Sequence, residues 1–127
     1  IKNLGLLNKV RFLGYVPNNK IKNYFGIADV FILPSEEEGF PHALLEAMAA
    51  GVPFVAFAVG GVPEITPLEL KTYLIPEKNI AVFSKKIQEL LHKNPEELKS
   101  IKASLSMWVK KYDISNTVKE FSNLIYG

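Results

Sequence analysis

The sequence predicts an α/β fold, with a Rossmann-like parallel sheet flanked by helices and a helical C-terminal tail. Two observations predict it. Short apolar runs such as "VFIL" and "VPFVAFAV" alternate with segments whose apolar residues recur at helical spacing, whereas the last third of the chain shows helical spacing alone. Strands that alternate with helices are typical of a parallel sheet with helical crossovers. The length of 127 residues fits one domain, 1–127.

The first half of the chain contains two expected strands and two expected helices. Val10–Tyr15 is rich in β-branched and aromatic residues and is expected to be a strand. The segment "PNNKIKNYFGIA" has helical spacing, and "DVFILPS" is typical of a strand buried on both faces. A helix is expected over Pro41–Ala50, with Gly51 as its C-terminal stop.

The second half begins with a strand in "VPFVAFAVGGVPE", which ends at a Gly-Gly turn, and "TYLI" is expected to be a short further strand. Three helices should follow. The first is amphipathic and is marked by Ile80, Phe83, Ile87, Leu90 and Leu91. The second begins with Asn94 as N-cap and a proline at its first position. The third has Val118, Phe121 and Ile125 on its apolar face and is capped near Asp113 or Ser115.

Composition excludes several classes of protein. The chain is 48% hydrophobic and 22% charged, as in an ordinary globular domain, and its net charge of +2 is too balanced to indicate a nucleic-acid partner. There are no cysteines, so no disulfide or thiolate metal site is expected. The apolar runs are too short to cross a bilayer. We expect a cytoplasmic location, and the lysine-rich C-terminal half leaves peripheral attachment to the inner face of the membrane as an alternative.

In a parallel α/β sheet, ligands bind at the carboxyl ends of the strands, here the loops Gly14–Asn19, Ser35–His42 and Gly60–Glu64. The start of the expected helix at Pro41 offers unpaired backbone N–H groups to an anion such as phosphate. Gly39 lets a ligand approach the backbone. The candidate donors are the N–H groups of Phe40, His42, Ala43, Leu44 and Leu45.

Glu38 and Glu46 precede and follow this helix start, and their carboxylates could accept hydrogen bonds from hydroxyl groups on either side of a phosphate. A nucleotide-sugar has that order of groups. Simpler interpretations stay open from the residues alone. Glu38 could be a solvated loop acid, Glu46 an exposed helix position, His42 a capping residue, and Gly60-Gly61 a plain turn.

The stretch "VRFLGYVPNNKIKNYFGIADVFILPSEEEGFPHALLEAMAAGVPFVAFAVGGVPEI" resembles the donor-binding, C-terminal half of retaining glycosyltransferases of the GT-B fold, family 4 type. Glu38 and Glu46 match the Glu-x7-Glu pattern of that family. The resemblance implies that Glu46 binds the ribose hydroxyls of the donor and that Glu38, the catalytic residue, faces hydroxyls of the transferred sugar. It also implies that backbone from Gly39 to Leu45 holds sugar and phosphate, and that Tyr15 and Val16 lie at the edge of the base.

The resemblance also indicates what the chain lacks. The acceptor domain is absent, as is a strand–helix unit that carries an arginine and a lysine for the donor phosphates, and Ile1–Lys9 resembles the tail of a helix from that unit. The segment "ITPLELKTYL" replaces the glycine-rich stretch of the family, so Glu64 is left as a possible helix cap only. This portion alone is therefore expected to be inactive.

By the same resemblance, the parent enzyme transfers a hexosyl-type sugar from a UDP-, GDP- or ADP-sugar to a glycan or lipid-linked acceptor, in polysaccharide biosynthesis. No cofactor and no obligate metal are expected. Two alternatives come from other classes of protein. One is a stand-alone nucleotide-binding or scaffolding module without catalysis, and the other is a sugar-diphosphate epimerase or phosphorylase of similar architecture.

Overall fold

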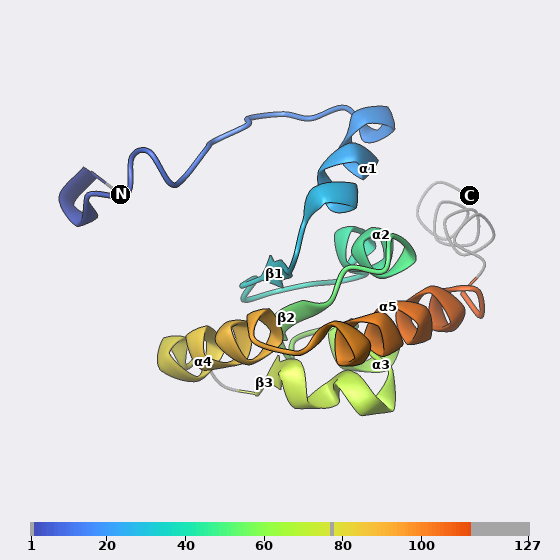
Figure 1. Ribbon diagram of the computed structural model, residues 1–127. Helices are drawn as coiled ribbons and strands as arrows, with labels where there is room; N and C mark the ends of the chain where they lie inside the picture. Colours follow the sequence, from blue (N-terminus) through green and yellow to red (C-terminus); the bar gives the residue numbers. More distant parts are fainter. Residues whose placement is uncertain (1, 77, 113–127) are drawn as a thin grey trace.

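A parallel three-stranded sheet forms the centre of the domain. The structure, a computed structural model, describes residues 2–76 and 78–112. The strands are β1 (Phe31–Leu33), β2 (Phe54–Phe57) and β3 (Leu74–Ile75), in the spatial order β1-β2-β3 (Figure 1). Phe31 lies opposite Phe54 in the parallel register of the first pair. Every residue of β2 is buried. The predicted α/β class with a parallel sheet is therefore confirmed.

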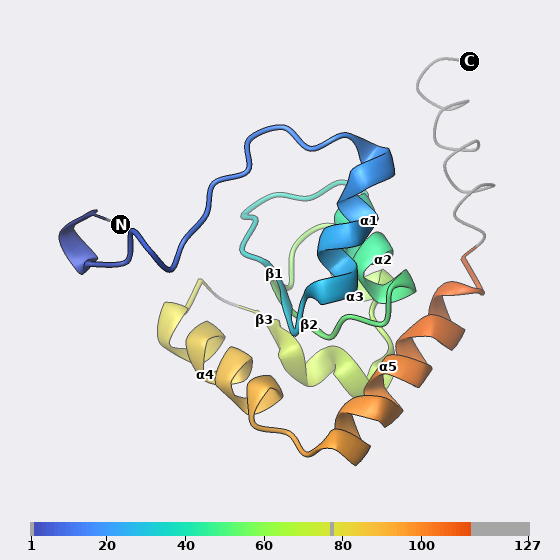
Figure 2. The same ribbon diagram turned by 45° about the horizontal axis from the view of Figure 1, so that its top comes forward.

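Helices precede, connect and follow the strands, as the alternating pattern predicted. The longer helices are α1 (Asn18–Ile27), α2 (His42–Ala49), α4 (Ile80–Leu91) and α5 (Pro95–Val109), and α3 (Val62–Ile65) is a single turn. Two 3-10 helices, η1 (Lys2–Leu4) and η2 (Leu68–Tyr73), complete the described elements. Helices α2 and α4 both contact β2 and lie on opposite sides of it (Figures 1 and 2).

Local sequence signals explain where several helices begin and end. The Asn94 side chain accepts a hydrogen bond from the Glu97 N–H over 2.9 Å, and the Glu97 carboxylate accepts one from the Asn94 N–H, which completes a capping box at the start of α5. Gly51 ends the α2 segment with φ of +72°, a left-handed conformation that L-residues with a side chain rarely adopt. Both signals were predicted, and both are confirmed.

The expected strand at Val10–Tyr15 is wrong. In the structure these residues belong to an extended arm that runs from η1 to the start of α1, away from the sheet (Figure 2). Phe12 is 82% exposed and Tyr15 is 89% exposed. A strand needs a neighbour to which its backbone can bond, and the three strands within the described residues pair only with one another. High β-propensity therefore does not produce a strand here.

Three smaller expectations also differ. Strand β1 is not buried on both faces, because it lies at the outer edge of the sheet and its central residue Ile32 is 46% exposed. The expected helix tail at Ile1–Lys9 is only the 3-10 turn η1 followed by turns. Helix α2 begins at His42, one residue later than predicted, with Pro41 as its N-cap. The expected helix around Phe121 lies outside the described residues.

Candidate functional site

The loops that follow β1 and β2 contact each other directly at the carboxyl edge of the sheet. The Gly61 N–H donates to the Gly39 carbonyl over 3.2 Å. Gly60 has φ of +53°, and a Cβ atom added there would lie 1.6 Å from the carbonyl oxygen of Glu38. Only glycine allows this approach. The Gly-Gly pair is therefore more than a plain turn, because it is the surface against which the acidic loop packs.

Helix α3, which follows the two glycines, is fixed by aromatic side chains from α5 and from the turn after it. The indole N–H of Trp108 donates to the Ile65 carbonyl over 2.8 Å, and the Tyr112 hydroxyl donates to the Glu64 carbonyl over 3.2 Å. These bonds satisfy carbonyls that the short helix cannot pair internally. Helical spacing in the sequence predicts Trp108 only as part of an apolar face, so this role of its indole N–H was not predicted.

Glu38 is half-buried, and its backbone is held against Gly60. Within residues 2–76 and 78–112, its carboxylate makes no hydrogen bond or ion pair, so it remains available to a ligand. Glu36 behaves differently, since it forms an exposed ion pair with Lys78 over 2.6 Å. Lys78 follows β3 closely and thus places one positive charge at the same edge of the sheet.

The start of α2 offers fewer free donors than its sequence suggested. The N–H of His42 donates to the Phe40 carbonyl over 3.0 Å, and those of Leu44 and Leu45 donate to the Pro41 carbonyl over 3.1 and 3.2 Å. The Phe40 and His42 rings also contact each other, with centroids 4.8 Å apart.

Ala43 is the exception among the residues from His42 to Leu45. It is half-buried, and its N–H has no acceptor among the described residues. A phosphate at this helix start would therefore meet the Ala43 N–H first, assisted by the positive end of the helix dipole.

Glu46 lies on the side of α2 that faces α1, where it lines a cavity of about 330 Å³. The other lining residues come from the same two helices and the turn after α2: Asn18, Ile21, Lys22, Phe25, Ala49 and Ala50. Glu46 is half-buried, and its carboxylate has no hydrogen-bond or ion-pair partner in the part of the chain that the structure describes. An uncompensated, half-buried carboxylate beside a cavity is not an ordinary exposed helix position.

Helix α2 lies between α1 and α3 in both views (Figures 1 and 2). Glu46 faces the α1 side, and the loop with Glu38 packs beside α3. The two acids thus flank the start of α2, as the spacing predicted. Tyr15 and Val16 lie in the arm just before Asn18, which lines the Glu46 cavity. Val16 is half-buried, whereas the side chain of Tyr15 extends into solvent.

The described residues offer neither a metal-binding cluster nor a membrane-spanning helix. They contain no group of three or more His, Cys, Asp or Glu side chains that could hold a metal ion. Their helices are also too short or too polar to cross a membrane.

A parallel sheet flanked by helices, with two carboxylates near the helix after its first strand that have no partner among the described residues, forms a Rossmann-like domain. Comparison with known families identifies the family to which this domain belongs. The model of the family "Glycosyl transferases group 1" matches residues 1–107, so the chain belongs to this family of glycosyltransferases. The predicted family relationship is confirmed at this level.

Individual relatives agree. A glycosyltransferase from Escherichia coli named for colanic acid biosynthesis, WcaL, is 32% identical over 104 residues, which are 77% of this chain and 26% of the relative. The amylovoran biosynthesis glycosyltransferase AmsK of Erwinia amylovora is 40% identical over 74 residues, 54% of this chain and 18% of the relative.

The N-acetyl-alpha-D-glucosaminyl L-malate synthase of Bacillus anthracis is 43% identical over 65 residues, 51% of this chain and 16% of the relative. The chain therefore spans about a quarter or less of the length of these curated relatives.

Proposed function

We propose that this chain is the donor-binding portion of a retaining glycosyltransferase of the family 4 type, which transfers a hexosyl-type sugar from a nucleotide-sugar. The observation that carries the proposal is the unpaired, half-buried carboxylate of Glu46 at the cavity between α1 and α2. Burial of a charge without a protein partner is costly, and a ligand that donates hydrogen bonds to it would recover that cost.

In this proposal, Glu46 accepts hydrogen bonds from the two ribose hydroxyls of the donor. Asn18 and Lys22 line the same cavity and supply polar groups around the ribose. The arm that contains Tyr15 and Val16 precedes Asn18, and its backbone borders the base. A ribose in this cavity directs the diphosphate toward the start of α2, where the Ala43 N–H is the donor without a described acceptor.

Glu38 acts on the transferred sugar. The backbone of Glu38 is held at the edge of the sheet by the contact between the acidic loop and Gly60-Gly61, so the path of the loop that carries its side chain is set before the donor arrives. The Glu38 carboxylate accepts hydrogen bonds from hydroxyls of that sugar, while backbone from Gly39 to Leu45 borders the sugar and phosphate. No metal takes part in this arrangement.

The acceptor is a glycan or a lipid-linked saccharide, bound mainly by a part of the enzyme outside this chain. Two relatives are named for the biosynthesis of the polysaccharides colanic acid and amylovoran, which supports a role in polysaccharide biosynthesis. We place the parent enzyme in the cytoplasm, with peripheral attachment to the inner face of the membrane as the alternative. This chain alone binds the donor but does not complete the transfer.

Isothermal titration calorimetry with UDP, GDP, ADP and their sugar conjugates tests the proposal. One of the three nucleotides should bind saturably, and Glu46→Ala should weaken it by about 1.5–3 kcal/mol, because a hydrogen bond to a charged group is lost. This corresponds to an affinity about ten to a hundred times lower. Glu37→Ala is the matched control, since Glu37 is an exposed acid of the loop that precedes α2. Equal binding by the parent chain and Glu46→Ala would refute the assignment.

A further inference from the structure

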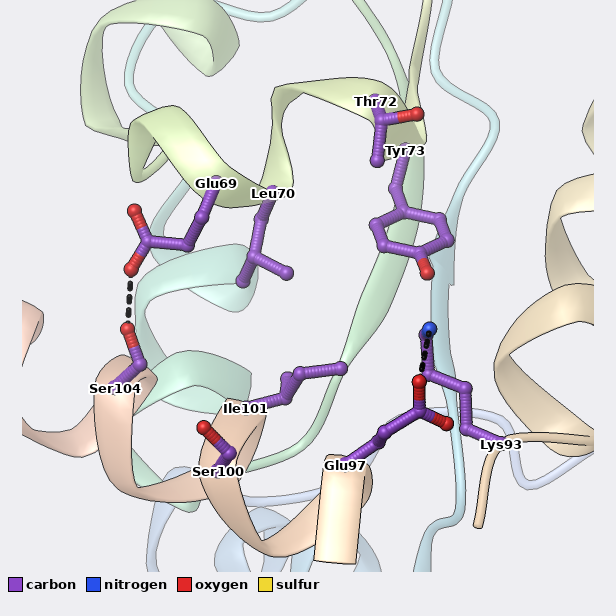
Figure 3. Close-up of a pocket in the computed structure, with 9 residues that line it drawn as sticks. All are labelled: Glu69, Leu70, Thr72, Tyr73, Lys93, Glu97, Ser100, Ile101 and Ser104. Atoms are coloured by element: carbon purple, nitrogen blue, oxygen red, sulfur yellow. Dashed lines mark hydrogen bonds and ion pairs between the residues drawn. The ribbon is translucent and has the colours of Figure 1, made fainter.

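A second cavity, of about 450 Å³, lies between η2 and α5 (Figure 3). It is separate from the carboxyl edge that holds Glu38, because η2 leads directly into the amino end of β3. Leu70 and Ile101 lie at its middle and present apolar surface. A volume of this size falls within the range of small-molecule sites, about 300–1,000 Å³.

Tyr73 marks one end of this cavity. Only 5% of the residue is exposed, and the ammonium of Lys86 lies 5.6 Å from its ring centroid. Its hydroxyl points into the cavity toward Lys93 (Figure 3), and it makes no hydrogen bond to any residue that the structure describes. No side-chain nitrogen or oxygen atom that is buried among the described residues lacks a partner, so the Tyr73 hydroxyl reaches solvent although its ring is buried. The hydroxyl of Tyr73 is therefore available to a ligand inside the cavity.

The other polar groups of the cavity set its charge. At the far end from Tyr73, the Ser104 hydroxyl donates to the Glu69 carboxylate. That hydrogen bond is the main reason why the pKa of Glu69 lies below its ordinary value. Lys93 and Glu97 form an ion pair over 3.8 Å at the end of the cavity toward which the Tyr73 hydroxyl points (Figure 3). The lining side chains carry two carboxylates and one ammonium, and Lys86, which donates to the lining residue Thr72, adds a second ammonium, so the cavity has no net positive charge that would favour a phosphate or another anion.

We propose that this cavity binds a neutral saccharide ring, at a site separate from the donor site and independent of the proposed function. A pyranose presents C–H groups on its faces and hydroxyls around its rim. Its face would lie on Leu70 and Ile101, with rim hydroxyls bonded to the Tyr73 hydroxyl at one end and the Glu69 carboxylate at the other. Sugar hydroxyls both donate and accept, so they match a cavity that offers a hydroxyl, a carboxylate and an ammonium together.

Two-dimensional amide NMR of the full chain tests this proposal, with the methyl glycosides of glucose, galactose and mannose as probes. At least one probe should shift amides of η2 and of α5 near Ile101 saturably, with a millimolar dissociation constant. Tyr73→Phe keeps the buried ring and removes only the hydroxyl. It should weaken binding about three- to tenfold, as expected for one hydrogen bond. Tyr24→Phe is the matched control, because Tyr24 is an exposed residue of α1 that does not line the cavity.

A second variant, Ser100→Arg, places a long side chain at an exposed position on the rim of the cavity and should abolish the shifts without unfolding the chain. The proposal is overturned if none of the three glycosides shifts these amides. It is equally overturned if binding is unchanged in both Tyr73→Phe and Ser100→Arg. Shifts confined to the loops around Glu38 would assign the saccharide to the donor site instead.

Discussion

Gly60 is the position at which a single added methyl group tests how the acidic loop is held. In Gly60→Ala the new Cβ would lie 1.6 Å from the Glu38 carbonyl oxygen, so the two backbones would have to separate by about 1.4 Å to reach the 3.0 Å limit for Cβ contacts. The positive φ of +53° adds a second cost, about 1–2 kcal/mol for an L-residue. Overpacking of this kind typically costs about 1–3 kcal/mol.

Together these two costs predict that Gly60→Ala lowers the free energy of unfolding by about 2–5 kcal/mol. Urea denaturation followed by circular dichroism and by tryptophan fluorescence measures it. Trp108 is the single tryptophan of the chain and bonds to α3, the helix that follows Gly60 closely. Its fluorescence therefore also reports a displaced loop.

Gly26→Ala is the matched control, because a Cβ there would meet nothing within 4 Å and the residue lies inside α1. Replacement of a helical glycine by alanine should raise stability by about 0.5–1 kcal/mol. If Gly60→Ala lowers stability by less than about 0.5 kcal/mol, the range of an ordinary surface substitution, then the close approach of the two loops is not a constraint and the reasoning fails.

Substitutions at three other positions test single interactions. Trp108→Phe removes the donor to the Ile65 carbonyl and should cost about 1–3 kcal/mol in urea unfolding followed by circular dichroism. Asn94→Ala removes the cap of α5 and should cost about 1 kcal/mol by the same measurement, whereas Asn94→Gly should cost only a few tenths. Ser104→Ala should raise the pKa of Glu69 toward its ordinary value in an NMR titration, and an unchanged pKa would contradict its cause.

The effect of Ser104→Ala on stability follows from the link between the pKa of Glu69 and the free energy of unfolding. Because the pKa of Glu69 is lowered in the folded chain, the ionised carboxylate stabilises the fold at neutral pH. That contribution is lost as the pH falls through the lowered pKa, below the ordinary range of a glutamate. In Ser104→Ala, the free energy of unfolding should therefore change less across this acidic pH range than it does in the parent chain.

Local signals predicted the parts of the fold that local chemistry decides. Asn94 followed by proline and two acids specifies a helix start by itself, and Gly51 specifies a helix end, so both were found from sequence. Val10–Tyr15 shows the limit of this reasoning. Its residues favour a strand, yet a strand forms only against a neighbour, and neighbours are a property of the whole chain. The exposure of Ile32 has the same origin, because sequence does not say which strand is at the edge.

The candidate site divides in the same way. The spacing of Glu38 and Glu46 around a helix start was enough to predict that they flank it. The hydrogen-bond partners of the backbone groups were not predictable. The N–H groups of Leu44 and Leu45 donate to the Pro41 carbonyl only because of the geometry of the turn before α2. The cavity between η2 and α5 could not be predicted from the sequence either, because it joins residues that lie about thirty positions apart.

The position of Glu38 depends on residues far from it along the chain. Its loop packs on Gly60 and Gly61, these glycines lead into α3, and α3 is bonded to Trp108 of α5. Each contact is between backbone groups or to a backbone carbonyl, so each constrains the path of the chain rather than a single side chain. A substitution in α5 that frees α3 should therefore loosen the acidic loop as well. Helix α5 thus supports the loop that carries Glu38, the residue on which the proposed transfer depends.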